Sequence, residues 1–133
     1  MILLYHGITD PSGVFDPFSL CVSPENFEEH LSILCRDAHP MGLEEMAQKL
    51  KNGGLPPRAV AITFDDGYAD NFYLAKPLLE KFKIPATVFV ITGFLGDTFW
   101  WDDLTRIILQ PEKLPQRLSL KLDGSIYQSS LHN

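Results

Sequence analysis

The sequence predicts an α/β fold built on parallel strands, and three observations support this class. Ala59–Phe64 is a short apolar run rich in β-forming residues, which is typical of a buried strand. A helical pattern over residues 70–82 and a β-branched run over residues 87–92 follow it. Strand, helix and strand at this spacing predict a right-handed βαβ unit and a parallel pair. Residues 23–25, Ser-Pro-Glu, are a typical helix start with a capping serine.

The chain opens with residues 1–5, which predict another buried strand. His6 lies at the carboxyl end of this strand, where it fits an acid, an orienting group, a ligand or a hydrogen-bonded structural histidine. Residues 7–22 are predicted to form a loop. The turn-forming residues of this loop are Pro11, Gly13 and Pro17. Phe15 and Phe18 in the same stretch fit either a platform for a sugar ring or ordinary packing.

Two amphipathic helices are predicted before the central strand. The apolar face of the first is formed by Phe27, Leu31 and Leu34. The second covers residues 43–51 and ends at Gly53. Its inward side chains are expected to be Leu43, Met46, Ala47 and Leu50. His30 lies at the edge of the first apolar face and His39 lies in a connection, so both are expected to be structural or surface residues.

The helix at residues 70–82 is predicted to be capped by Asp70. Pro77 should kink or restart it, because proline lacks a backbone N–H. Its inward side chains are expected to be Phe72, Ala75, Leu79 and Phe82. A further helix is predicted to begin at Phe99, and alternating apolar residues around Asp123 predict a β-hairpin over residues 117–128.

Composition limits the expected partners and location. The 133 residues are 45% hydrophobic, which suffices for a packed core, and a single domain over residues 1–133 is expected. A net charge of −6 without a basic run argues against nucleic acid or an anionic membrane as a partner. Cys21 and Cys35 are too few for a disulfide framework. Nothing resembles a signal peptide or a membrane span, so a cytoplasmic location is expected.

Asp65 and Asp66 follow the strand Ala59–Phe64 directly and are the leading candidates for chemistry. Two unit charges about 4 Å apart repel by roughly 4 kcal/mol at an effective dielectric of about 20, so the pair needs a cation, a shared proton or open water. Successive side chains of a strand point to opposite sides, so one carboxylate can hold a metal while the other acts on a water. Gly67 would allow a positive φ beside the site. Asp-Asp-Gly also fits a simple turn.

Residues 63–68, Thr-Phe-Asp-Asp-Gly-Tyr, resemble the first motif of the polysaccharide deacetylases, the NodB-homology or carbohydrate esterase family 4 proteins. Residues 3–7, Leu-Leu-Tyr-His-Gly, and residues 84–90, Ile-Pro-Ala-Thr-Val-Phe-Val, fit the same family in the same order. The resemblance covers most of residues 1–93. It implies a metal-dependent N-deacetylase acting on acetylated amino sugars, built on a distorted (β/α) barrel.

By this resemblance Asp65 is the general base, Asp66 is a ligand of a divalent metal, with Zn²⁺ as the expected ion, and His6 is a general acid. The substrate-binding positions expected are Tyr5, Tyr68, Trp100 and Trp101. Adjacent tryptophans can stack on pyranose rings, but they also fit anchors of a packed helix. The family's other two metal ligands come from a later His-x-x-x-His-type motif, which these 133 residues do not contain.

The length predicts only part of the family fold, because complete eight-stranded barrels run to roughly 250 residues. The expected fold is therefore a partial (β/α) barrel of the NodB type, the truncated N-terminal portion of such a domain, with the hairpin as an insertion. An open half-barrel exposes strand edges and apolar faces, which favours self-association. The expected partner is an acetylated amino-sugar glycan.

Two other functional classes stay open. One is a catalytically inactive, carbohydrate-binding or partner-dependent remnant of the same fold, supported by the missing histidines and the short length. The other is a receiver-like signalling domain, in which clustered aspartates bind Mg²⁺ and accept phosphate. The second class also needs a repeating βα pattern with a further acidic strand end and a lysine-bearing strand end, and the sequence shows no such pattern.

Overall fold

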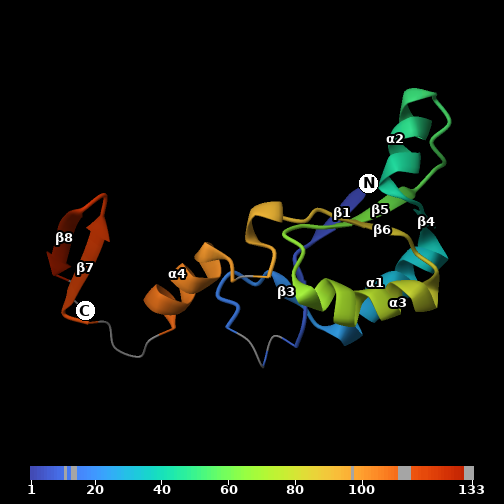
Figure 1. Cartoon of the computed structure of the whole chain (residues 1–133). Helices are drawn as coiled ribbons and strands as arrows, with labels where there is room; N and C mark the ends of the chain where they lie inside the picture. Colours follow the sequence, from blue (N-terminus) through green and yellow to red (C-terminus); the bar gives the residue numbers. More distant parts are fainter. Residues whose placement is uncertain (11, 13–14, 97, 111–114, 131–133) are drawn as a thin grey trace. The chain divides into compact units, whose positions relative to one another are not determined.

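The computed structural model of the protein describes residues 1–10, 12, 15–96, 98–110 and 115–130. They fall into two compact units, Met1–Leu95 and Gly96–Asn133 (Figure 1). The single domain over residues 1–133 stays a prediction. In the first unit the strands are β1 (Ile2–Tyr5), β2 (Gly7–Ile8), β3 (Cys21–Val22), β4 (His39–Pro40), β5 (Ala59–Phe64) and β6 (Ala86–Val88). Its helices are α1 (Pro24–Asp37), α2 (Leu43–Lys51), the π-turn η1 (Asn71–Ala75), α3 (Lys76–Phe82) and the 3-10 turn η2 (Thr92–Phe94).

β5 is the central strand of a four-stranded sheet, and all of its partners run parallel to it. β1 pairs with residues 61–64 and β6 with residues 62–64, so these two strands lie on opposite edges of β5. β4 pairs with Ala59 and Val60 at the start of β5. The predicted parallel βαβ unit is therefore confirmed, although β6 begins and ends earlier than the predicted strand at residues 87–92.

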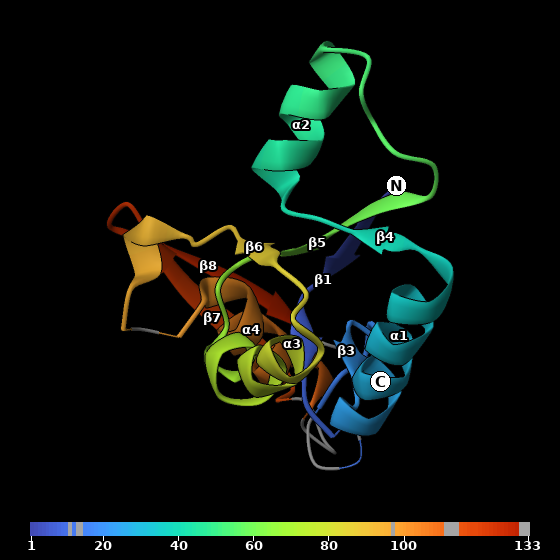
Figure 2. The same cartoon turned by 90° about the vertical axis from the view of Figure 1, so that its right-hand side faces the viewer.

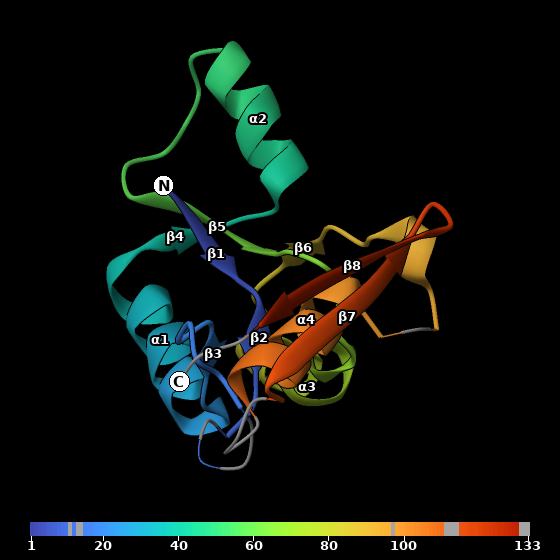
Figure 3. The same cartoon turned by 90° about the vertical axis from the view of Figure 1, so that its left-hand side faces the viewer.

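Every residue of β5 is buried because helices cover both faces of the strand. Val60, Ile62 and Phe64 belong to a core cluster with residues of α1 and of the η1–α3 helix. Ala59 and Ala61 point the other way and pack with Met46 of α2. Figure 2 and Figure 3 show α2 on one side of the strands and α1 and α3 on the other. The apolar run that predicted a buried strand thus reflects two covered faces.

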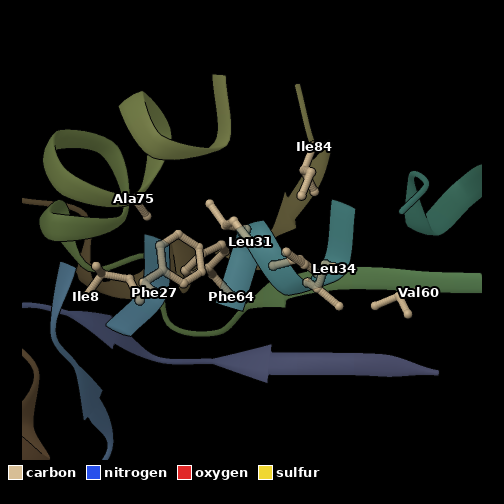
Figure 4. Packing of buried hydrophobic residues seen from close by; sticks show 9 residues of the cluster. Ile8, Phe27, Leu31, Leu34, Val60, Phe64, Ala75 and Ile84 are labelled. Atoms are coloured by element: carbon tan, nitrogen blue, oxygen red, sulfur yellow. The ribbon is translucent and has the colours of Figure 1, made fainter. Parts of the chain in front are cut away.

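The larger core cluster gathers around α1 (Figure 4). The helix α1 starts as predicted. The Ser23 side chain accepts a hydrogen bond from the Asn26 N–H at 3.2 Å, and Pro24 follows this N-cap residue. Its predicted apolar face is confirmed, since Phe27, Leu31 and Leu34 are all buried. The second helix has the predicted bounds, but Leu50 is 65% exposed and Met46 is its one buried side chain among the described residues.

Three predictions about the first forty residues need correction. β1 is only half-buried, because α1 and α3 cover the face that carries Leu3 and Tyr5 and leave Ile2 and Leu4 more than half exposed. The predicted loop at residues 7–22 contains β2 and β3, which pair in parallel. His39–Pro40 is a short strand and not a connection. Strands of two residues are too short to show an alternating pattern. Pro11 and Gly13, on which the loop prediction partly rested, lie outside the described residues.

The helix after β5 begins irregularly. The Lys76 N–H bonds to the Asn71 carbonyl, an i to i−5 bond that defines the π-turn η1, and α3 starts immediately afterwards with Pro77 in its first turn. The predicted restart at Pro77 is confirmed. The extra residue of the π-turn changes which side chains face inward, so Phe72 is 60% exposed and the predicted inward position is wrong. Asn71 and Ala75 are buried instead.

The second unit contains α4 (Trp100–Leu109) and a two-stranded antiparallel sheet of β7 (Arg117–Leu122) and β8 (Ser125–Ser130). The predicted helix and the predicted hairpin are therefore both present. Asp123 and Gly124 connect the strands with φ of 49° and 80°, the left-handed pair that a two-residue hairpin turn requires. Among the described residues of the whole chain, no helix has the length and apolar character needed to cross a bilayer.

Candidate active site

His6, Asp65 and Asp66 lie together at the carboxyl edge of the parallel sheet. β1 ends one residue before His6, and β5 ends one residue before Asp65. The pairing continues past the end of β5, because the Asp65 N–H donates to the carbonyl of Tyr5, the last residue of β1, at 3.0 Å. In open α/β sheets, ligands bind at the carboxyl ends of the strands, and the residues that act on them lie there too. The sequence-based expectation that the first strand and the central strand meet here is confirmed.

A direct side-chain contact at the site joins His6 Nδ1 to Asp66 Oδ2 at 3.0 Å. Both side chains are partly exposed, at 30% and 22%. An ionised carboxylate can only accept a hydrogen bond, so Nδ1 of His6 is the donor. That tautomer leaves Nε2 as the ring nitrogen that exchanges a proton. Asp65 is also partly exposed beside this pair.

The backbone at Asp66 adopts a tight turn. Asp66 has a φ of 68°, and the Gly67 N–H donates to the Asp65 carbonyl at 2.8 Å, which closes a γ-turn with Asp66 at its centre. A left-handed residue other than glycine is strained, and such strain is commonly found at functional sites. The predicted positive φ at Gly67 is confirmed at 79°, and the one at Asp66 was not predicted. A Cβ at Gly67 would lie 3.2 Å from the Val90 side chain, so the turn also packs tightly.

Two of the predicted substrate-binding residues lie in the first unit. Tyr5 packs edge-on against Phe27 with ring centres 5.1 Å apart, and its hydroxyl lies 3.1 Å from Nδ1 of His30. Burial raises the pKa of the Tyr5 hydroxyl above its ordinary value. These contacts are those of a core residue and lend no support to sugar binding by Tyr5. Tyr68 is partly buried beside Gly67 and lines a cavity of about 650 Å³.

The other two predicted substrate-binding residues belong to α4 in the second unit. Trp100 is 58% exposed at the first helical position. Trp101 stacks on Phe99 with ring centres 4.6 Å apart and planes 10° apart. This stacking favours the packing interpretation for Trp101. Sugar binding by either tryptophan stays a prediction.

Two residues that the sequence did not single out as site residues, Asp70 and Asn71, reach the site from the start of the helix after β5. Oδ2 of Asp70 accepts a hydrogen bond from the Ile8 N–H at 3.2 Å, and burial raises the pKa of this carboxyl. With its amide oriented to satisfy its neighbours, Asn71 donates to the His6 main-chain carbonyl and to Oδ1 of Asp70, both at 3.0 Å. The prediction that Asp70 caps this helix is wrong, because Asp70 has helical φ and ψ and makes no side-chain cap bond.

A signal for Asn71 does exist in the sequence. Asn71 lies four residues before Ala75, and both are buried, so a polar side chain occupies a position that helical spacing assigns to the core. Buried polar side chains are almost always hydrogen-bonded. An asparagine at such a position therefore indicates a specific polar partner, here the His6 carbonyl.

The described residues do not complete a metal site. Among them, no three His, Cys, Asp or Glu side chains lie close enough together to hold an ion. Catalytic zinc sites usually take three protein ligands. Asp66 and His6 are two such side chains in direct contact at this edge.

Comparison with known proteins finds relatives of this chain among deacetylases. Residues 52–113 match the family model described as polysaccharide deacetylase. A poly-β-1,6-N-acetyl-D-glucosamine N-deacetylase of Staphylococcus aureus is 42% identical over 77 residues, which is 57% of this chain and 27% of that protein. The chain belongs to the polysaccharide deacetylase family. The family resemblance seen in the sequence is therefore confirmed, and Asp65, Asp66 and Gly67 lie within the matched segment.

Solved relatives share the α/β fold of this chain. Streptococcus pyogenes deacetylase PplD, solved in complex with acetate, is 34% identical with a TM-score of 0.60, over 69% of this chain and 42% of that one. IcaB from Ammonifex degensii is 28% identical with a TM-score of 0.63, over 74% of this chain and 41% of that one. The chain thus spans less than half the length of each of these relatives.

Proposed function

We propose that the protein containing this chain is an N-deacetylase that hydrolyses the N-acetyl groups of an acetylated amino-sugar polysaccharide. The observation that carries the proposal is the contact between His6 and Asp66 beside Asp65, at the carboxyl edge of β1 and β5. The Staphylococcus aureus relative is named for poly-β-1,6-N-acetyl-D-glucosamine, so this polymer is the first substrate to test.

The chain's own side chains support a simple division of roles. Asp65 takes one proton from a water whose oxygen bonds to the acetyl carbon. The carbon–nitrogen bond then breaks, and His6 gives one proton to the departing amine. Because Nδ1 of His6 donates to Asp66, the proton given to the amine is the one that the doubly protonated imidazole carries on Nε2. Acetate and a free amino sugar are the products.

Metal binding is a separate part of the proposal. The family resemblance implies a divalent ion, with Zn²⁺ expected, and Asp66 is the ligand that this chain would supply. The described residues do not provide a three-ligand set, and the proposed roles of Asp65 and His6 involve no step through the ion.

The architecture around the site is also proposed. β1, β5 and β6 are strands of a (β/α) barrel, and the hairpin of β7 and β8 is an insertion in it. Ile2 and Leu4 on β1 are exposed apolar side chains that such a barrel would cover. The same exposure supports self-association through open strand edges.

The test uses the protein at its natural length with short poly-β-1,6-N-acetylglucosamine oligomers, and measures released acetate. Asp65→Asn and Asp66→Asn should each lower kcat by at least about 100-fold, the scale of general acid–base catalysis. Asp37→Asn is the matched control, because Asp37 pairs with Arg36 on the exposed end of α1. Unchanged acetate release in both active-site variants would overturn the proposal. Chelation followed by metal addition tests the ion separately.

A second function is favoured by the incomplete ligand set among the described residues. A catalytically inactive member of the family would bind the glycan and release no acetate. Saturable binding of the oligomers by the natural-length protein, with no acetate released at any added divalent metal, would identify this function.

A further inference from the structure

We propose that Asp70 and Asn71 are positioning residues that hold the His6 imidazole against Asp66. This inference rests on the proposed function, in which His6 serves as the acid. Both residues lie at the start of the helix that follows the Asp65–Asp66 turn, so this helix would help to position His6. We call the two residues the helix-start clamp.

The two residues of the helix-start clamp form hydrogen bonds to the backbone on both sides of Gly7. Asn71 donates to the His6 carbonyl at 3.0 Å, and Oδ2 of Asp70 accepts from the Ile8 N–H at 3.2 Å. The two clamp side chains are also joined, since the Asn71 amide donates to Oδ1 of Asp70 at 3.0 Å. The segment that leaves β1 is therefore fixed at two successive peptide units. The direction of the His6 side chain depends on that backbone.

Burial supports a specific role for Asn71. It is 6% exposed, and Ala75 one turn later is fully buried. A buried amide carries a desolvation cost unless it is hydrogen-bonded, and an apolar residue of similar size would avoid that cost. The amide at this position is accounted for by its bonds to the His6 carbonyl and to Asp70.

Gly7 provides independent evidence that the clamp is tightly fitted. A Cβ at this position would lie 3.2 Å from Oδ2 of Asp70 and 3.1 Å from the Cys21 sulfur. Gly7 has no positive φ, so the need for glycine here comes from the close approach of the Cys21 sulfur and of the Asp70 carboxylate. A methyl group would push the Asp70 carboxylate away from the Ile8 N–H.

The first measurement reports the position of His6 whether or not the protein is active. In the natural-length protein labelled with ¹⁵N-histidine, the His6 imidazole signals are assigned by their loss in His6→Gln. Asn71→Ala and Gly7→Ala should each shift the His6 Nδ1 signal, because its hydrogen bond to Asp66 is disturbed. Ser23→Ala, which removes the cap of α1 and touches neither residue, should leave the signal in place. An unchanged His6 signal in both clamp variants would overturn the inference.

The second measurement tests whether the clamp acts through His6. Asn71→Ala should lower kcat by about 10- to 100-fold with little change in KM, the scale of a misplaced catalytic group. In a His6→Ala background the same change should cost less than about 2-fold, because coupled residues are not additive. Asp70→Asn keeps an acceptor for the Ile8 N–H, so it should retain more activity than Asp70→Ala. Equal losses from Asn71→Ala with and without His6 would show a merely structural role.

The two proposals fail differently. If the unsubstituted protein releases no acetate, the proposed deacetylase function is wrong, and the imidazole signals still decide the clamp. If acetate is released but the clamp variants leave the His6 signals and kcat unchanged, the function stands and the clamp is wrong. Should Asn71→Ala fail to fold, Gly7→Ala and Asp70→Ala carry the same two measurements.

Discussion

Nδ1 of His6 lies 3.0 Å from Oδ2 of Asp66, although the two residues are 60 positions apart in the chain. Their meeting depends on the pairing of β1 with β5, in which Tyr5 is opposite Phe64. Parallel neighbours in register end at the same edge, so the residue after each strand faces the same space. The candidate site is thus a consequence of sheet register and of the γ-turn that aims Asp66.

The first prediction concerns the left-handed backbone at Asp66. Asp66→Asn should leave the free energy of unfolding nearly unchanged, because asparagine tolerates this conformation. Asp66→Val should lower it by about 1–2 kcal/mol, the cost of left-handed φ for a residue with a branched Cβ. Asp65→Val is the matched control, since Asp65 has no positive φ. Urea unfolding measures the free energy of unfolding of all three variants. Equal losses of stability in Asp66→Val and Asp65→Val would contradict the γ-turn.

The second prediction concerns pH and the carboxyl of Asp70. Burial raises its pKa in the folded state above the ordinary value of 3.8. The folded protein then binds this proton more tightly than the unfolded chain, so the contribution to stability is present below about pH 4 and is lost as pH rises through the raised pKa. Relative to Asp70→Asn, the unsubstituted protein should therefore lose stability as pH increases over that window.

The contribution of Asp37 to stability should change with pH in the opposite direction to that of Asp70, so Asp37 serves as the comparison. The hydrogen bond from Arg36 lowers the pKa of Asp37 below its ordinary value. Its contribution is present above about pH 4 and is lost as pH falls through the lowered pKa. Urea unfolding of Asp37→Asn and Asp70→Asn between pH 3 and pH 6 checks both signs. Parallel pH dependence in the two variants would show that burial does not govern Asp70.

Local chemistry made much of the fold predictable from sequence. The helix Leu43–Lys51 has the predicted bounds, and Ser23 caps α1 as expected. The Asp123–Gly124 turn is also recognisable from residue type alone. Each of these features depends on residues within one or two turns of the chain, which a sequence pattern records directly.

Features that depend on distant partners were not predictable in this way. β2, β3 and β4 have two residues each and exist because of the strands beside them. At the site, Asp65, Asp66 and His6 could be singled out because each follows an apolar strand. Asp70 and Asn71 were missed because an aspartate at a helix start ordinarily indicates an N-cap, and their partners near Gly7 are more than 60 residues away.

The third prediction concerns the core beneath β5. Phe27 is fully buried and packs edge-on against Tyr5 and Phe64. Phe27→Ala should lower the free energy of unfolding by about 3–5 kcal/mol, the range for buried aromatic residues. Phe18→Ala makes the same change at a side chain that is 63% exposed and should stay within about 0.5 kcal/mol of the unsubstituted protein. A small loss at Phe27 in denaturant unfolding would contradict the described packing.

The fourth prediction concerns the end of α3. Lys83 follows the helix with φ of 55° and ψ of 36°, and the bonds from the Lys83 and Ile84 N–H groups to the carbonyls of Glu80 and Leu79 close the helix end. Lys83→Gly should stabilise the protein by up to about 1 kcal/mol, because glycine adopts this conformation without the Cβ penalty. Lys81→Gly, two residues earlier inside the helix, should instead destabilise it by about 1 kcal/mol or more, since it also removes the Lys81–Glu28 ion pair. Thermal unfolding of the two variants should therefore give shifts of opposite sign, and shifts of the same sign would mean that Lys83 does not cap α3.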